Sequence, residues 1–123
     1  MTLPRFDSLG LAKPLVAAVQ ALGYEEPTPI QLEAIPVLLA GGDLIGQAGT
    51  GTGKTAAFAL PLLHRLLQSQ ASATRGPRGL ILVPTRELAM QVAEAVHKYG
   101  KQTPLRVVPV YGGAPMDQQA RAL

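Results

Sequence analysis

The 123-residue chain contains no cysteine, which excludes a disulfide framework and a thiolate metal site. It has no run of eighteen apolar residues, so no ordinary membrane-spanning helix is predicted. The opening stretch MTLPRFDSLG lacks the basic and apolar regions of a signal peptide. There is no internal repeat, and the net charge of +3 comes without a cluster of basic residues, which alone indicates an ordinary surface. With 47% hydrophobic residues, the sequence predicts a globular, cytoplasmic protein with no membrane partner.

What the chain does contain is an alternation of helix-like and strand-like segments. Short apolar strands are predicted over 43–46, 79–83 and 105–111, and helices over 11–22, 28–40, 53–70, 85–99 and 116–123. Strands separated by helices predict parallel pairing, because parallel neighbours need a long crossover. We therefore expect an α/β fold, a parallel sheet with flanking helices. Three strands and a final helix that has barely begun suggest a sheet truncated before it is complete.

The stretch GQAGTGTGKT, from Gly46 to Thr55, joins the first predicted strand to a helix. Glycines allow backbone N–H groups and the positive end of a helix dipole to close around phosphate oxygens. Lys54 then supplies a charge for the β and γ phosphates, and the Thr55 hydroxyl can bind Mg²⁺. The pattern G-x-x-x-x-G-K-[ST] is missed at its first position, which holds another small residue, Ala48. These residues predict a loop for a nucleoside triphosphate, such as ATP, with Mg²⁺; the alternative is a plain glycine-rich turn. The predicted loop residues are Ala48, Gly49, Thr50, Gly51, Thr52, Gly53, Lys54 and Thr55.

Upstream, the stretch GYEEPTPIQ from Gly23 to Gln31 allows two interpretations. Thr28 and Gln31 fit a capping box, in which the Gln31 side chain bonds back to the Thr28 backbone. Alternatively, the Gln31 amide pairs with N6–H and N7 of adenine, while Tyr24 stacks on the ring. Taken alone, the stretch favours the capping interpretation.

The combination of segments resembles the DEAD-box ATP-dependent RNA helicases, most closely bacterial members. The resemblance rests on four motifs in order: a Q motif region over 6–31, motif I over 48–55, motif Ia (PTRELA) over 84–89 and a glycine pair at 112–113. Ala48 is the residue that this family normally has there. The resemblance implies that the chain is the front part of a P-loop NTPase domain with a RecA-like sheet, and that the second RecA-like domain is absent.

The family resemblance also implies individual roles. In the nucleotide pocket Gln31 reads adenine, Tyr24 stacks on it, Phe6 supports the pocket and Pro29 belongs to the Q motif. RNA backbone contacts are implied for Pro84, Thr85, Arg86, Gly112 and Gly113. From the residues alone, the first N–H groups of the helix, the Thr85 hydroxyl and the Arg86 guanidinium could together hold a phosphate. The alternative is that Thr85 only caps the helix, Arg86 only faces solvent and the glycine pair is a plain turn.

Hydrolysis requires acidic residues that hold Mg²⁺ and orient water. After Lys54 the only acids are Glu87, Glu94 and Asp117, and none of them follows an apolar strand. The resemblance implies an ATP-dependent RNA helicase, and the lack of such acids predicts that its 123-residue part is inactive by itself. Two alternatives are a nucleotide-binding switch such as a GTPase, which would need an absent Asn-Lys-x-Asp stretch, and a small-molecule kinase, which leaves two motifs unexplained. His64 and His97 have no partner at metal-ligand spacing and are predicted to be surface residues.

Overall fold

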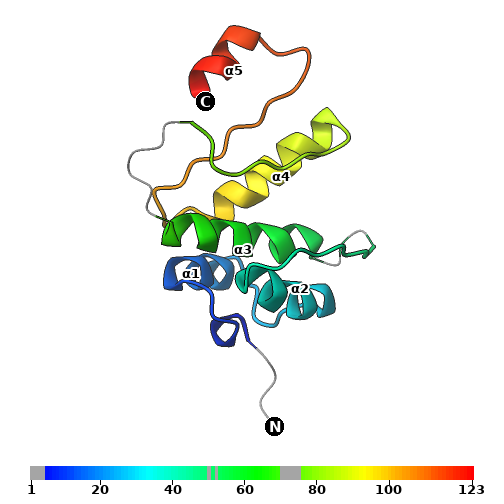
Figure 1. The fold of residues 1–123 in the computed structure, drawn as a ribbon, viewed down its shortest axis with the longest axis vertical. Coiled ribbons are helices and arrows are strands. Elements are labelled where there is room, and N and C mark those ends of the chain that lie inside the picture. Colours follow the sequence, from blue (N-terminus) through cyan, green and yellow to red (C-terminus); the bar gives the residue numbers. More distant parts are fainter. Residues whose placement is uncertain (1–4, 50, 52, 70–75) are drawn as a thin grey trace.

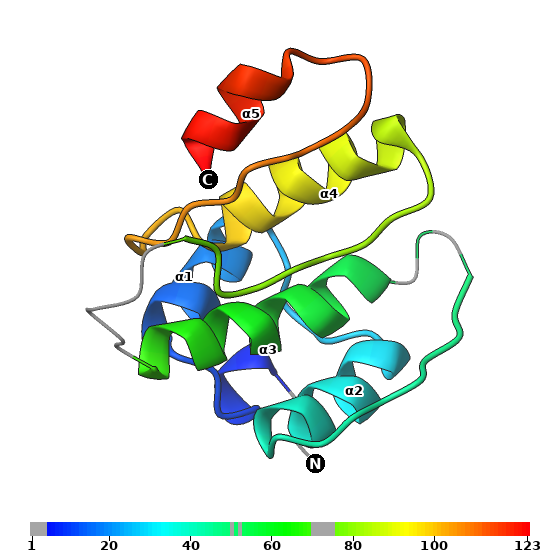
Figure 2. The same cartoon turned by 45° about the horizontal axis from the view of Figure 1, so that its top comes forward.

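The structure, a computed structural model, describes residues 5–49, 51, 53–69 and 76–123. A short 3₁₀ helix, η1 (Phe6–Ser8), precedes the α-helices α1 (Lys13–Ala21), α2 (Pro29–Leu39), α3 (Lys54–Gln68), α4 (Arg86–Tyr99) and α5 (Met116–Ala122). Helix α3 crosses the middle of the molecule, with α1 and α2 on one side and α4 on the other (Figures 1 and 2). No helix of the described residues is long and apolar enough to cross a membrane.

The core lies around α3. Its buried side chains Ala56, Ala59, Leu60 and Leu63 recur three or four positions apart, so that one face of the helix is apolar. This face packs in a single cluster with apolar side chains of the other elements, namely Phe6, Leu11, Leu15, Val16, Val19, Ile35, Val92, Val96 and Tyr99. Alanines allow close approach of neighbouring helices. The packing fixes α3, and thereby the position of Lys54 at its first turn.

Helix boundaries follow the predicted signals closely. Thr28 is the N-cap of α2 and Pro29 its first residue, as predicted. The Thr85 hydroxyl accepts a hydrogen bond from the Leu88 N–H at 3.1 Å and so caps α4. Gly23, two residues after α1, adopts a left-handed φ of +87°. The five helix predictions are therefore confirmed within about two residues at the ends that the structure describes.

The three predicted strands are not paired. Within the described residues, segments 43–46, 79–83 and 105–111 have no strand assignment, and no ladder of backbone hydrogen bonds joins them. A strand requires a neighbour for its N–H and C=O groups, and these segments do not supply one another with it. The predicted sheet is thus not confirmed.

Segment 79–83 nevertheless keeps a two-residue periodicity. Ile81 and Val83 pack against the core, whereas the side chains of Leu80 and Leu82 are 82% and 85% exposed. Alternation of this kind is typical of one strand with one covered face. The segment runs beside α3, since a side chain at Gly79 would contact Leu62.

Two side chains outside the predicted motifs hold the ends of helices. His64 on α3 is half-buried, and its Nδ1 accepts a hydrogen bond from the Ala12 N–H at 3.0 Å, just before α1. The prediction that His64 is a surface residue is therefore wrong, because its ring ties α1 to α3. His97 is exposed, as predicted. At the other end of α3, the Arg78 guanidinium donates to the carbonyl oxygens of Leu66 and Ser69 and so satisfies the last turn.

Candidate functional site

The glycine loop leads directly into the first turn of α3. Gly51 and Gly53 have φ values of +79° and +84°, which other residues rarely adopt. Among the residues that the structure describes, no side chain caps this end of α3, and the first N–H groups of a helix have no acceptor within it. Lys54 is exposed there and Thr55 is half-buried, while Ala48 is half-buried and Gly49 exposed. This end of α3 can therefore bind an anion. Thr50 and Thr52 lie outside the described residues.

Gln31 joins the capping segment to the glycine loop. Its Oε1 accepts from the Thr28 N–H at 2.9 Å, as the capping interpretation predicts. Its Nε2 donates to the Gly53 carbonyl oxygen at 3.1 Å, a bond that spans 22 positions of sequence. The side chain is only 2% exposed. Gln31 therefore connects the two predicted motifs, and its amide retains one N–H and one lone pair for other partners.

The contact between these segments leaves no room for a side chain at Gly53. A Cβ at this position would overlap Gln31 Nε2 and lie 3.0 Å from Thr28 Oγ1. Thr28 Oγ1 is buried and makes no hydrogen bond within the described structure, so only the Gln31 half of the predicted capping box has hydrogen-bond geometry. Glycine at position 53 is thus required by both backbone conformation and packing.

The two predicted aromatic residues, Phe6 and Tyr24, contact each other. Phe6 is 1% exposed and belongs to the core, and its ring centroid lies 6.4 Å from that of Tyr24. Tyr24, 39% exposed, also meets the Tyr99 ring edge-on at 6.2 Å. Burial raises the pKa of Tyr99, and the side-chain hydrogen bond with Tyr24 raises it further. Tyr99, at the end of α4, was not singled out by the sequence, because its helical spacing is explained equally well by core packing.

The residues with predicted RNA contacts also lie close together. Gly113 has a φ of +90°, and a Cβ there would lie 3.2 Å from Nη1 of Arg86. Motif Ia and the glycine pair, far apart in sequence, therefore meet at the start of α4. Pro84, Thr85, Arg86 and Gly112 are all exposed. A Cβ at Gly112 would meet nothing within 4 Å, so packing within the described chain does not explain that glycine.

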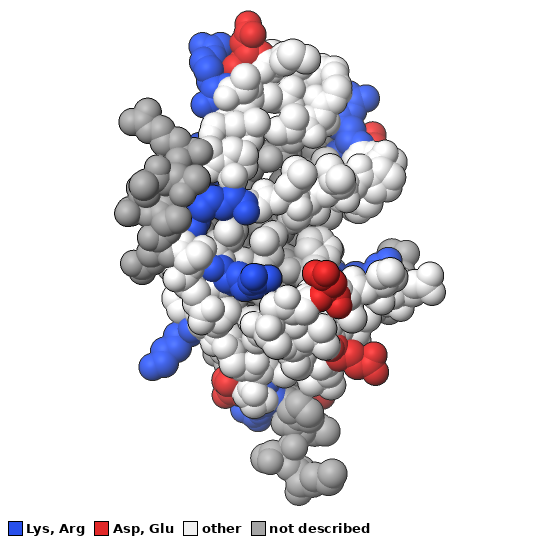
Figure 3. Space-filling model, in the orientation of Figure 1, with Lys and Arg blue, Asp and Glu red and all other residues white. Residues whose placement is uncertain are grey.

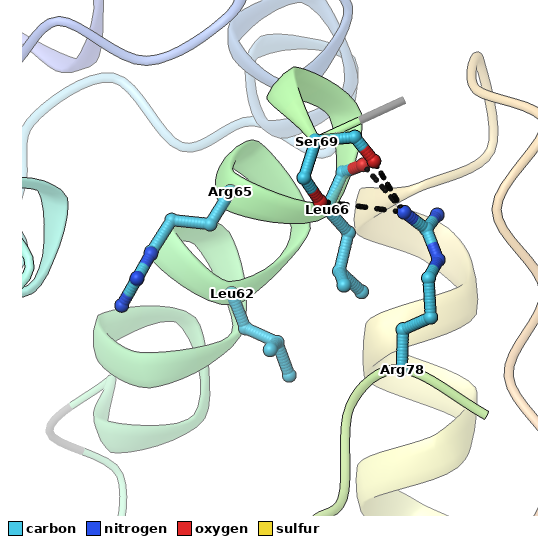
Figure 4. Close-up of a pocket in the computed structure, with 5 residues that line it drawn as sticks. All are labelled: Leu62, Arg65, Leu66, Ser69 and Arg78. Carbon is cyan, nitrogen blue, oxygen red and sulfur yellow. Dashed lines mark hydrogen bonds between the residues drawn. The ribbon is translucent and has the colours of Figure 1, made fainter. Parts of the chain in front are cut away.

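Two hollows adjoin α3. One, of about 650 Å³, has Lys54 and Thr55 on its rim and is otherwise lined mainly by apolar side chains of α2, α3 and segment 80–83. The other, of about 360 Å³, lies near the end of α3, where Arg78 points toward Ser69 and Arg65 points away (Figure 4). The glycine loop lies at the opposite end of α3, so this second hollow is separate from it.

The charged side chains are spread over the surface that Figure 3 shows. On the face in Figure 3, Lys and Arg side chains occupy separate positions with uncharged surface between them. The single ion pair found within the described residues is Lys98–Glu94, at 3.3 Å on the exposed side of α4. The described residues therefore form no broad basic patch on this face.

Comparisons with known proteins decide the family. A family model of DEAD/DEAH box helicases matches residues 28–123. The chain belongs to the DEAD/DEAH box helicase family. It is 50% identical over 118 residues to the DEAD-box ATP-dependent RNA helicase CshA of Bacillus cereus, a match that covers 96% of this chain and 22% of that protein. The chain thus spans about a fifth of the length of this curated relative.

Solved structures of the family have the same fold. The RNA helicase Prp28 from Chaetomium thermophilum, bound to ADP, has a TM-score of 0.87 and 43% identity, covering 98% of this chain and 30% of that one. A DEAD box protein from Methanococcus jannaschii has a TM-score of 0.85 at 37% identity, covering 97% and 32%. Dbp5 of S. cerevisiae, bound to RNA and ADP BeF3, has a TM-score of 0.71 at 40% identity, covering 80% and 25%.

Proposed function

We propose that this chain is the adenine-nucleotide-binding and RNA-binding front part of an ATP-dependent RNA helicase. The observation that carries the proposal is the hydrogen bond from Gln31 Nε2 to the Gly53 carbonyl oxygen. It connects a potential base-reading amide to a loop suited to phosphate. The neighbouring cluster of Arg86 and Gly113 supplies a second site for a nucleic-acid backbone.

The phosphate groups are held at the start of α3. The donors suited to this are the uncapped N–H groups of its first turn and the exposed Lys54 ammonium group. The Thr55 hydroxyl supplies one oxygen ligand to Mg²⁺, an ion that keeps several waters and binds nucleotide phosphates. Within the described residues no three acidic or histidine side chains are grouped to hold a metal ion. In this proposal the metal binds together with the nucleotide, whose phosphate charge it neutralises.

The base is read next to this loop. The spare N–H and lone pair of the Gln31 amide match N7 and N6–H of adenine, whereas guanine offers an oxygen acceptor in place of N6–H. Because Gln31 is 2% exposed, the loop around Gly53 must move to admit the base. Tyr24 stacks on the ring with its exposed side, and Phe6 acts through the core by supporting Tyr24.

RNA is bound through its backbone at the start of α4. The exposed Arg86 guanidinium suits bidentate bonds to a phosphate, and Gly112 and Gly113 let the strand approach the main chain. Open space around Gly112 is what a contacting RNA strand requires. Since these contacts involve no base edges, binding is independent of sequence.

In the complete protein, segments 43–46, 79–83 and 105–111 form strands of a RecA-like parallel sheet. The two-residue alternation of segment 79–83 supports this proposal, because its outward leucines need a covering neighbour. Acids that activate water are also missing after Lys54. The 123-residue chain therefore binds nucleotide without hydrolysing it at a useful rate, and helicase activity belongs to the longer protein.

The test is a calorimetric titration of the chain with ADP and with GDP, in the parent, in Lys54→Ala and in a control, Lys101→Ala. Lys101 is an exposed lysine beyond α4. We expect tighter binding of ADP, a loss of about tenfold or more in Lys54→Ala and parental affinity in the control. Equal affinity for the two bases would instead support a generic phosphate loop, as in a nucleotide-binding switch or a small-molecule kinase.

A further inference from the structure

Gln119, on helix α5, makes hydrogen bonds to the residues on both sides of the glycine pair. Its Oε1 accepts a hydrogen bond from the Tyr111 N–H at 2.7 Å, and its Nε2 donates to the Ala114 carbonyl oxygen at 3.4 Å. Tyr111 and Ala114 are the residues immediately before and after Gly112 and Gly113. One half-buried side chain therefore ties together both ends of the four-residue turn.

The turn has little else to fix its conformation. Both glycines are exposed, and no backbone hydrogen bond within the described chain joins residues 111–114 to another segment. Glycine carries the largest conformational entropy of any residue, so an untied pair would sample many conformations. Gly113 also lies against Arg86, so that movement of the turn displaces one wall of the Arg86 site.

We propose that Gln119 is a positioning residue for RNA binding. By holding Tyr111 and Ala114, it keeps the glycine pair in the conformation that receives the RNA backbone beside Arg86. This inference rests on the proposed function, which places RNA at these residues. Gln119 acts through the turn and does not itself contact RNA.

The neighbouring Gln118 provides a matched control, since it is an exposed glutamine on the same helix. The experiment compares the parent, Gln119→Ala, Gln119→Glu and Gln118→Ala. A fluorescent single-stranded oligouridylate reports RNA affinity, ADP titration reports the nucleotide site, and amide hydrogen exchange reports the Tyr111 N–H. Gln119→Glu retains the acceptor for Tyr111, loses the donor to Ala114 and adds a negative charge near the proposed RNA site.

We expect Gln119→Ala to weaken RNA binding about tenfold, the equivalent of one hydrogen-bonded phosphate contact. ADP affinity should stay unchanged, and the Tyr111 N–H should exchange faster. In Gln119→Glu the Tyr111 N–H should stay protected while RNA binding weakens, because the acceptor remains and the new charge repels phosphate. Gln118→Ala should match the parent. A loss of RNA affinity without a loss of ADP affinity distinguishes positioning from a general loss of stability, which would weaken ADP binding as well.

Three results would overturn the inference, and they have different meanings. If Gln119→Ala binds RNA as tightly as Gln118→Ala, Gln119 does not position the site. If ADP and RNA affinities fall together, its role is only structural. If the parent binds no RNA, the proposed RNA function fails, and with it the role assigned to Gln119.

Discussion

Replacing Gln31 with alanine tests the link between the capping segment and the glycine loop. The change removes two part-buried hydrogen bonds and leaves the Thr28 N–H and the Gly53 carbonyl oxygen without these partners, beside a side chain that is 2% exposed. Each buried group left unpaired costs about 1–3 kcal/mol. We expect a loss of about 3 kcal/mol in the free energy of unfolding, or about 12 °C in Tm for a domain of this size.

The assay is urea unfolding followed by circular dichroism, with Gln20→Ala as the control. Gln20 is exposed on α1, so its replacement should change the free energy of unfolding by less than about 0.5 kcal/mol. A Gln31→Ala loss as small as the control's would refute the reasoning, because the two bonds would then contribute nothing.

A carboxyl group at position 31 gives an independent check. In Gln31→Glu an oxygen faces the Gly53 carbonyl oxygen, and this repulsion raises the pKa of the introduced carboxyl in the folded state. Stability relative to the parent should therefore be best at acidic pH, below the unfolded value of about 4.3, and should be lost as pH rises through the folded pKa. A deficit that is the same at all pH values would contradict the proposed Nε2 donor bond.

Three further predictions follow from single contacts. Thr85→Ala removes the acceptor for the Leu88 N–H and should destabilise the chain by about 1 kcal/mol in urea unfolding; no change would show that α4 starts without this cap. Burial and Tyr24 raise the pKa of Tyr99, so the folded chain should lose stability as pH rises above the ordinary tyrosine value of about 10. In an ultraviolet titration one tyrosine should then ionise after the others, and three equivalent tyrosines would contradict this. Arg78→Ala should leave ADP affinity unchanged while lowering Tm, because Arg78 donates to Leu66 and Ser69 at the far end of α3.

Local signals in the sequence predicted the helices well. Thr28 with Pro29 and Thr85 mark helix starts through chemistry confined to one turn, and the structure confirms both. Strands depend on partners distant in sequence, so segments such as 79–83 have strand composition without strand pairing here. The prediction that His64 lies on the surface failed for a similar reason, since its hydrogen-bond partner Ala12 lies 52 positions away in the sequence.

The members of the candidate site stay predictions, and the sequence did not show how they contact one another. Motif order identified Gln31 and the glycine loop, but the direct bond to Gly53 depends on how α2 packs against α3. The sequence did not indicate a role for Gln119, because a glutamine on a short polar helix is common. Its hydrogen bond beside the glycine pair is seen only in the folded structure. Side chains that act by positioning others are in general visible only in three dimensions.

The central claim is that one chain carries both a nucleotide loop and an RNA-binding face. Its most direct test is the affinity of the chain for a fluorescent single-stranded RNA in the parent, in Arg86→Ala and in Arg65→Ala, an exposed arginine on α3. We expect sequence-independent binding that weakens as salt rises, with an affinity that falls about tenfold in Arg86→Ala alone. An absence of RNA binding, or equal losses in the two variants, would contradict it.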